Sequence, residues 1–339
     1  MNKIIKRVLA TSLAVTMVGA AFAGCSAKTD EGTTTANNAE AKTYTVGIAQ
    51  LVQHEALDAA TEGFKEALTE KLGDQVVFVE KDAAGDIPTC ATITNGFVAD
   101  GVDLILANPT PVLQAAAQST TEIPIVATAV TSFAAALDIA DEDWTGATGI
   151  NVTGTSDLAP LAEQAAMFKE LTPNAKKIGI VYCSAEANSV YQAEVIAEEL
   201  KKLGFETKDF TASETNDIAQ VVQAACDECD ALYIPTDNTM ASATGTIEPI
   251  VTKAKKPVIA GEEGICKGCG VATLSISYKS IGYNAGLMAY DILVNGADPA
   301  TMDIKVPTKD DVVFKFVADR AEALGLTIPD NYEAMDISE

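Results

Sequence analysis

The same order of expected strands and helices occurs twice along this chain, and this duplication constrains the fold more than any other feature. The first copy alternates short apolar strands with helices at residues 45–49, 54–72, 76–79, 88–99, 104–107, 111–119 and 125–127. The second begins about 132 residues later, at 177–181, 189–203, 206–210, 216–226, 231–234, 240–254 and 257–260. Short buried strands between helices are typical of a parallel sheet covered on both faces, and this offset is too long for a solenoid repeat. We therefore predict an α/β protein with two Rossmann-like lobes.

The stretch between the copies, residues 149–154, begins and ends with glycine and suits a hinge. A helix at 278–294 and a strand at 312–316 follow the second copy. We expect the first lobe to hold residues 43–150 with about 277–305. The second lobe would hold residues 151–276 with about 306–330.

The start of the chain predicts export. Lys3, Lys6 and Arg7 precede an uncharged apolar run from residue 8 to 23, a pattern typical of a secretory signal. Residues 22–25, Phe-Ala-Gly-Cys, resemble the bacterial lipobox, which implies cleavage after residue 24 and a lipid on the Cys25 sulfur. A plain secretory signal with an incidental cysteine is the alternative. Residues 25–42 are polar and aperiodic, as in a flexible tether, so we expect an extracytoplasmic, membrane-anchored domain.

Charge excludes one class of partner. Without its first 24 residues the chain has 20 basic and 48 acidic residues, a net charge of −28. Nucleic-acid phosphates require the opposite sign, so we expect no nucleic-acid partner.

The cysteines leave two interpretations open. Two C-x-x-C pairs begin at Cys226 and Cys266, with 36 residues between them, and Cys90 and Cys183 stand alone. Two such pairs can hold zinc, but a zinc ribbon usually has a shorter gap. We favour small buried residues, with room for one disulfide in an expected loop at 266–269, and predict no metal and no cofactor.

Geometry selects the candidate site. In open parallel sheets, ligands bind beyond the carboxyl ends of the strands, and two facing lobes place these ends around one cleft. The first-lobe loops there contain Gln50, His54, Asn108, Thr110, Thr128 and Val130. The second-lobe loops contain Glu186, Asn188, Ser189, Thr236, Asp237, Asn238 and Glu262.

These side chains suit a zwitterion. Thr110 stands at a helix start, which favours an anion, so we expect a carboxylate at Thr110 and Thr128. An ammonium group would bind Asp237 or Glu186. The alternative is that Asp237 only caps a helix.

Catalytic signatures are missing from the sequence. His54 is the one histidine, and there is no G-x-S-x-G, no Walker loop and no G-x-G-x-x-G after the first strand. We therefore predict a binding protein rather than an enzyme.

Four segments, 50–58, 151–157, 186–189 and 235–239, resemble the signatures of ABC-importer substrate-binding proteins of the tryptophan/tyrosine-binding type. The resemblance implies a type I periplasmic-binding-protein fold, an amino acid-like and often aromatic ligand, closure at a hinge, and a membrane permease as partner. The chain departs from the family at 82–83, 132–133 and 266–269, and Phe133 could stack on an aromatic ligand or merely pack. A sugar or nucleoside ligand, or a secreted thiol or metal protein, are the alternatives.

Overall fold

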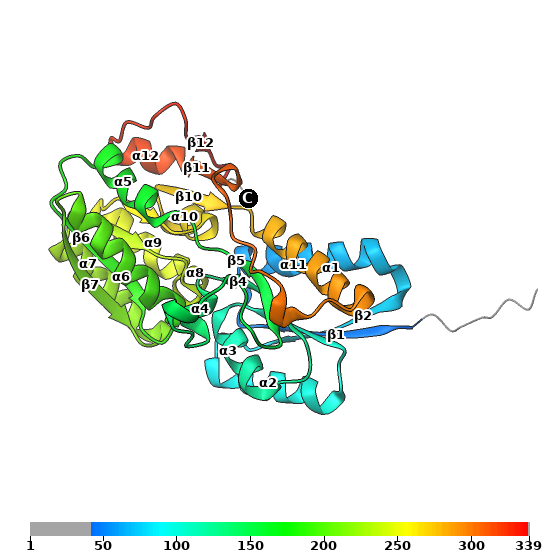
Figure 1. The fold of residues 1–339 in the computed structure, drawn as a ribbon. Coiled ribbons are helices and arrows are strands. Elements are labelled where there is room, and N and C mark those ends of the chain that lie inside the picture. The colour runs from blue at the N-terminus through cyan, green and yellow to red at the C-terminus, as the bar shows by residue number, and fades with distance from the viewer. Residues whose placement is uncertain (1–41, 338–339) are drawn as a thin grey trace, which may run out of the picture. The chain divides into compact units, whose positions relative to one another are not determined.

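Two mainly parallel sheets organise residues 42–337, the part of the chain that the computed structural model describes (Figure 1). The first sheet has the order β2-β1-β3-β4-β5 and is parallel throughout. Its strands are β1 (Tyr44–Gln50), β2 (Val76–Asp82), β3 (Leu104–Asn108), β4 (Ile125–Val130) and β5 (Val152–Ser156).

The second sheet has the order β12-β11-β10-β9-β8-β6-β7, and only β11 runs antiparallel to its neighbour β10. Its strands are β6 (Lys177–Cys183), β7 (Glu206–Ala212), β8 (Ala231–Ile234), β9 (Val258–Ala260), β10 (Ala272–Ile276), β11 (Val312–Phe316) and β12 (Glu333–Ala334). Each sheet forms the centre of one lobe. The predicted α/β fold with two Rossmann-like lobes is confirmed.

Four long helices cover the first sheet: α1 (Glu55–Leu72), α2 (Ile87–Asp100), α3 (Thr110–Ser119) and α11 (Tyr278–Asn295). Although α1 and α11 are far apart in sequence, they lie side by side (Figure 1). A Cβ on Gly282 would stand 1.9 Å from the backbone oxygen of Ala60. The pair can therefore approach this closely only because α11 has no side chain at that position.

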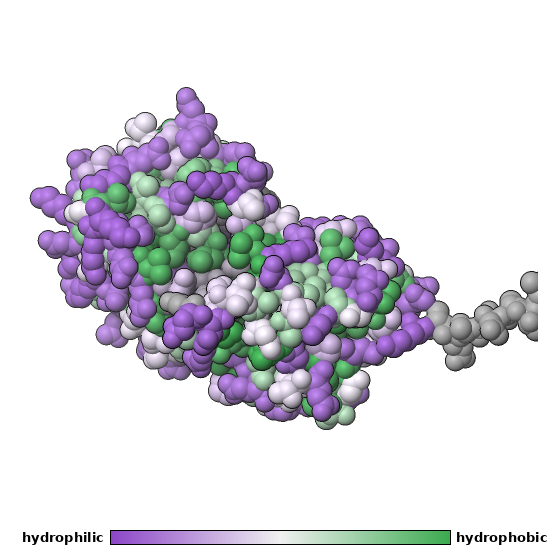
Figure 2. Space-filling model, viewed as in Figure 1, coloured by the Kyte–Doolittle hydropathy of each residue, from purple (hydrophilic) through white to green (hydrophobic). Residues whose placement is uncertain are grey.

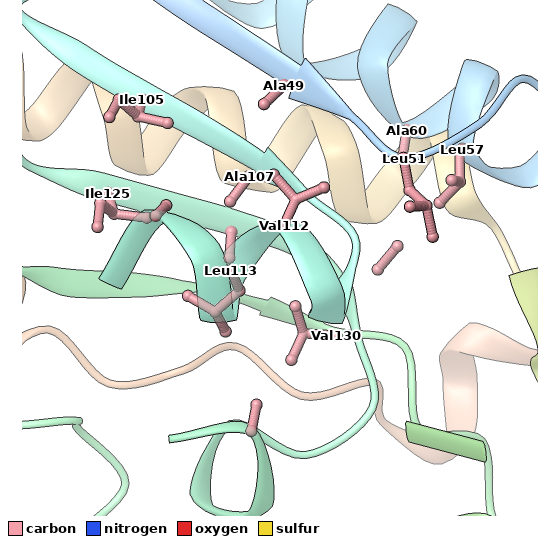
Figure 3. Close-up of a cluster of buried hydrophobic side chains, with 14 of the residues drawn as sticks. Ala49, Leu51, Leu57, Ala60, Ile105, Ala107, Val112, Leu113, Ile125 and Val130 are labelled. Atoms are coloured by element: carbon pink, nitrogen blue, oxygen red, sulfur yellow. The ribbon is translucent and has the colours of Figure 1, made fainter. Parts of the chain in front are cut away.

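The face of the first sheet opposite α1 and α11 packs against α3. Figure 3 shows Ile105 and Ala107 of β3 close to Val112 and Leu113 of the helix. Val130, a candidate ligand contact, belongs to the same fully buried cluster. Burying such side chains is the main stabilising contribution to a lobe of this kind, and it fixes the loops that follow β3 and β4.

The second sheet has a hydrophobic cluster on each face. One face packs against α7 (Ile218–Glu228), α8 (Asn238–Ser242), α9 (Thr244–Ala254) and α10 (Glu263–Cys269). The other packs against α5 (Leu161–Leu171), α6 (Ala187–Lys202) and α12 (Ala318–Leu324). The remaining elements are short: α4 (Phe133–Ala136), and the 3-10 turns Gly73–Gln75, Asp141–Asp143, Thr215–Asp217, Pro299–Thr301 and Lys309–Asp311.

Three connections join the lobes. Residues 157–160 lead from β5 to α5, Ser277 alone leads from β10 to α11, and residues 296–311 lead from α11 to β11. Residues 152–156, which the sequence assigns to the second lobe and partly to a hinge, pair with β4 in the first sheet. We therefore propose that the chain first leaves the first lobe after Ser156.

Two local expectations are corrected. The expected helix at 240–254 is divided into α8 and α9, which meet at Ala243. The expected loop at 266–269 is wrong, because these residues form the end of α10. The Glu262 carboxylate accepts hydrogen bonds from the Gly264 and Ile265 amides and so caps this helix despite its two glycines.

Hydrophilic residues cover the outer edges of the visible face, and hydrophobic residues gather in its middle (Figure 2). No helix in the described part of the chain is long and apolar enough to cross a bilayer. The predicted signal, Cys25 and nearly all of the predicted tether lie outside the described residues.

Candidate ligand-binding site

A narrow cavity lies between the two lobes, at the carboxyl ends of their strands; its free interior of about 10 Å³ has room for about one water molecule, so the lobes must separate to admit a larger ligand. His54, Ala56, Leu57 and Ala129 border it from the first lobe, and Asn188, Thr236, Asp237, Asn238, Ala241 and Glu262 from the second. Asp157, on the connection after β5, and Tyr278, the first residue of α11, complete the lining. Its position follows the rule for open parallel sheets. No lysine or arginine is among the lining residues.

A larger hollow of about 650 Å³ lies on the first lobe, between α1 and β2. It is open, its lining includes the ion pair of Lys65 with Glu80, and none of the buried unpaired polar side chains borders it. We therefore take the inter-lobe cavity as the candidate site.

The structure brings six of the predicted site residues to this cavity: His54, Asn188, Thr236, Asp237, Asn238 and Glu262. The other predicted residues do not border it: Gln50, Asn108, Thr110, Thr128, Val130, Glu186 and Ser189. Sequence reasoning missed Asp157 and Tyr278. Asp157 ends the 151–157 motif, which was a usable signal, whereas Tyr278 looks like an ordinary helix residue.

Buried polar atoms without a partner gather in the predicted loops. Among the described residues there are five: Asn108 Oδ1, Thr110 Oγ1, Asn188 Oδ1, Thr236 Oγ1 and Thr273 Oγ1. The first four belong to the predicted site. Asn188 and Thr236 border the cavity, whereas Asn108 and Thr110 do not. Buried polar groups are nearly always hydrogen-bonded, so the unpaired atoms require an explanation, and for the two at the cavity a polar ligand is one.

The acidic residues of the second lobe cap short helices. Asp237 Oδ1 accepts from the Met240 amide at 2.8 Å, and its Oδ2 accepts from the Cys183 amide at 2.6 Å. Glu186 Oε1 accepts from the Thr239 amide at 2.9 Å and its Oε2 from the Asn238 amide at 3.2 Å. Both carboxylates therefore stabilise the start of α8.

Two buried acidic residues of the second lobe, Asp237 and Glu262, border the cavity, and the pKa of each is raised. Burial raises the pKa of Asp237, and the nearby Glu186 carboxylate raises it further. Burial likewise raises the pKa of Glu262 to about 7. A positive charge at the second-lobe wall would stabilise the ionised form of these two carboxyl groups.

The first-lobe loops are arranged differently. No side chain caps α3, and Thr110 Oγ1 at its first residue is unpaired. Asn108 Nδ2 donates to Leu57 O and to Thr61 Oγ1, both at 3.0 Å, which leaves its Oδ1 free. Thr128 Oγ1 pairs with Thr155 Oγ1 at 2.9 Å.

Strand β4 is irregular where it meets the cavity. Its pairing with β5 shifts register between Ala127 and Val130, and Ala129 has a φ of 55°. A non-glycine residue in this conformation is strained, and such strain and bulges gather near functional sites. The irregularity places Ala129 in the cavity lining.

Two further titratable side chains border the cavity: Asp157, which follows β5, and His54, which belongs to the first lobe. Tyr278 Oη donates to Asp157 Oδ2 at 2.9 Å, and Thr131 Oγ1 donates to Asp157 Oδ1 at 3.1 Å. Burial raises the Asp157 pKa to about 6. His54 Nε2 lies 3.3 Å from Asn238 Oδ1 across the cleft, and burial lowers the His54 pKa.

The six cysteines in the described part of the chain are buried and unpaired. Burial raises the thiol pKa of Cys90 and Cys226 to about 11 and that of Cys269 to about 12, so these thiols are poor nucleophiles. Residues 42–337 contain no group of three or more His, Cys, Asp or Glu that could hold a metal ion.

Comparisons with known proteins identify the family of this chain. The family described as ABC transporter substrate binding protein matches residues 45–335. A tyrosine-binding protein of Clostridioides difficile (strain R20291) is 34% identical over 330 residues, covering 96% of this chain and 93% of that protein.

Two solved structures extend the comparison. An ABC domain in complex with L-Trp from Streptococcus pneumoniae has a TM-score of 0.80 at 32% identity, covering 85% of this chain and 97% of that one. A ligand-free, open substrate binding protein with adhesive properties from Clostridium difficile has a TM-score of 0.65 at 35% identity, covering 86% and 99%. With a family match over almost all described residues and a relative of this identity and coverage, the chain belongs to the ABC transporter substrate-binding proteins.

Proposed function

We propose that this protein binds an aromatic amino acid, tyrosine or tryptophan, between its lobes and delivers it to an ABC importer. The observation that carries the proposal is the inter-lobe cavity, where Asp157, Asp237 and Glu262 border a space that no lysine or arginine lines. Buried carboxylates require a positive partner, and the ligand's ammonium group would supply it. The tyrosine-binding relative and the L-Trp complex support this ligand class.

Asp157 is the carboxylate we assign to the ammonium group. Both oxygens of Asp237 already accept backbone amides, and Glu262 accepts two. Asp157 also accepts two hydrogen bonds, one at each oxygen, but both come from side-chain hydroxyls and the residue caps no helix. A carboxylate can accept further bonds, so Asp157 keeps capacity for a charged donor.

Although Thr110 does not border the cavity in this arrangement of the lobes, the ligand's carboxylate is proposed to bind at the start of α3. Thr110 Oγ1 is buried and unpaired there, and no side chain caps the helix. A helix start favours an anion. Thr128 was expected to share this role, but its hydroxyl already pairs with Thr155.

Closure of the lobes on the ligand is the proposed mechanism. Side chains already bridge the lobes, with Gln192 Nε2 donating to Thr131 Oγ1 at 3.1 Å and Lys267 pairing with Glu55. A ligand that contacts both lobes stabilises the closed state by its differential affinity. The higher TM-score to the L-Trp complex than to the open, ligand-free relative supports a closed arrangement here.

As an ABC transporter substrate-binding protein, the chain works outside the cytoplasm with the transporter's membrane permease. We further propose that residues 1–24 are removed and that a lipid on Cys25 anchors the protein through the tether at 25–42. Globomycin treatment of expressing cells should leave the precursor uncut, and a Cys25→Ala variant should leave the membrane fraction.

A thermal-shift screen tests the ligand. The protein from Lys42 onward, which contains every described strand and helix, is screened against the common amino acids, simple sugars and nucleosides. A ligand at 100 times its Kd adds about 2.7 kcal/mol to the free energy of unfolding. We expect shifts with tyrosine or tryptophan, whereas a response confined to a sugar or nucleoside would overturn the ligand class.

A further inference from the structure

One hydrogen bond joins the connection after β5 to the first residue of α11. Asp157 follows β5 directly, and Tyr278 lies two residues after β10. Tyr278 Oη donates to Asp157 Oδ2 at 2.9 Å, and both side chains are buried and border the cavity. The pair therefore lines the site and also lies where the chain passes between the lobes.

The same carboxylate is connected to the second lobe through two further side chains. Thr131 Oγ1 donates to Asp157 Oδ1 at 3.1 Å, and Gln192 Nε2 of α6 donates to Thr131 Oγ1 at 3.1 Å. Gln192 is fixed in its own lobe, because its Oε1 accepts from the Thr236 amide at 3.2 Å. Asp157 is thus held from two sides by hydroxyl groups.

We propose that Tyr278 is a positioning residue for ligand binding, whose hydroxyl keeps the Asp157 carboxylate ionised and oriented toward the ligand's ammonium group. The inference rests on the proposed function. Among the described side chains only two hydroxyls donate to Asp157, and neither carries a charge. Loss of one donor leaves a buried carboxylate half-satisfied, and such a group takes up a proton more readily.

The expected pH dependence follows from this balance. Burial raises the Asp157 pKa to about 6, while the hydrogen bonds from Tyr278 and Thr131 oppose the rise. An ammonium group binds the ionised carboxylate, so affinity falls as pH drops through the pKa of Asp157. Removing the Tyr278 hydroxyl raises this pKa, and the fall begins at a higher pH.

Other titratable groups face the same space and contribute to the profile. Asp237 precedes α8, Glu262 precedes α10, and His54 precedes α1. Glu186 lies behind Asn238, and Glu262 and Asp157 both face Tyr278. Because Glu262 also faces Tyr278, a shifted profile in a variant at position 278 is assigned to Asp157 only when removal of its other donor, Thr131, shifts the profile as well.

The test compares Tyr278→Phe with a matched control, Tyr332→Phe. Tyr332 Oη also donates to a carboxylate at 2.9 Å, that of Glu170, but it lies outside the cavity. Isothermal titration with L-tyrosine and L-tryptophan from pH 5 to 8.5 gives the affinity profile. We expect the half-point of the profile to move up by about half a pH unit or more in Tyr278→Phe, which corresponds to about a threefold loss at a pH below both half-points. Tyr332→Phe should follow the wild type.

A second variant protects the test against misfolding. Thr131→Val removes the other donor to Asp157 and should move the half-point in the same direction. Coincident profiles for wild type and for both variants would overturn the inference while the proposed ligand stood. A wild type that binds neither amino acid at any pH would overturn the proposed function itself.

Discussion

The loops that follow the third strand of each copy are equivalent in sequence position but opposite in electrostatics. In the first lobe, β3 leads into α3, which no side chain caps and whose Thr110 hydroxyl is unpaired. In the second lobe, β8 leads into α8, whose first amides are bound by Asp237 and Glu186. The first helix start can therefore still bind an anion, whereas the second has bound the protein's own carboxylates.

This difference would orient a zwitterion. The duplicated architecture provides two similar walls, and the caps give only one of them negative charge. An amino acid placed between them would direct its carboxylate to the first lobe and its ammonium group to Asp157 and the acidic wall of the second. The predictions below test this polarity, from the largest expected effect to the smallest.

The largest effect is expected for Asp157→Asn, which removes the negative charge and retains the shape. Truncating one partner of a buried charge pair costs about 2 kcal/mol or more, about a 30-fold loss of affinity. Titration calorimetry with L-tyrosine and L-tryptophan at pH 8 measures it. The exposed Asp298, whose Oδ1 accepts from the Ala300 amide, provides the control Asp298→Asn. An affinity within threefold of the wild type would rule out an ammonium contact at Asp157.

Asp237→Ala distinguishes a cap from a ligand contact. It leaves the buried Met240 and Cys183 amides without their acceptor, so the free energy of unfolding should fall by about 1–3 kcal/mol. Urea unfolding of the ligand-free protein gives this value. Affinity should fall less than in Asp157→Asn. Unchanged stability with abolished binding would instead make Asp237 the ammonium partner.

Thr110→Val tests the start of α3 as the proposed carboxylate site. One hydrogen bond to the ligand is worth about 0.5–1.5 kcal/mol, so affinity should fall about two- to tenfold. Stability should not decrease, because the hydroxyl has no partner in the ligand-free protein. Thr273→Val is a matched control, since Thr273 Oγ1 is also buried and unpaired but lies outside the predicted loops. Equal affinities of the two variants would remove the carboxylate from the start of α3.

The smallest effect concerns pH and the acidic wall. The pKa of Glu262 is raised in the folded protein to about 7, so the folded state binds this proton more tightly than the unfolded chain does. Protonated Glu262 therefore stabilises the folded state fully at a pH below the usual glutamate pKa, and this stabilisation is lost as pH rises toward 7. The ligand-free Glu262→Gln variant should lose a few degrees less in Tm than the wild type between pH 5 and 7.5. Parallel Tm curves, measured by differential scanning fluorimetry, would contradict this.

Most of the fold could be predicted from periodicity. The expected bounds of the strands at 231–234 and 312–316 match β8 and β11, because a short apolar run between polar residues has few alternatives. The helix α10 was missed because Cys266-Lys267-Gly268-Cys269 has poor helix propensity, and the Glu262 cap that compensates is a side-chain contact.

The site was predictable as a set of loops but not as a set of contacts. The position of strand ends selected Asn188, Thr236 and Asp237, which border the cavity. Whether a given carboxylate caps a helix or faces a ligand depends on the relative orientation of segments about 50 residues apart, such as Glu186 and Asn238. Tyr278 enters the site because the start of α11 lies beside the connection after β5, and no local sequence pattern records this contact between distant segments.

The single residue between β10 and α11 limits how the molecule can move. Ser277 has no slack, because Ile276 is paired in the second sheet and Ser280 donates its amide to the Ser277 hydroxyl. The helix beyond it cannot slide either, because at Gly282 it touches the backbone of α1. Translation or twisting of one lobe against the other would strain the chain at Ser277. Rotation about an axis through Ser277 is therefore the easiest motion between the lobes. A single pair of spectroscopic labels across the cleft would then report the whole opening coordinate.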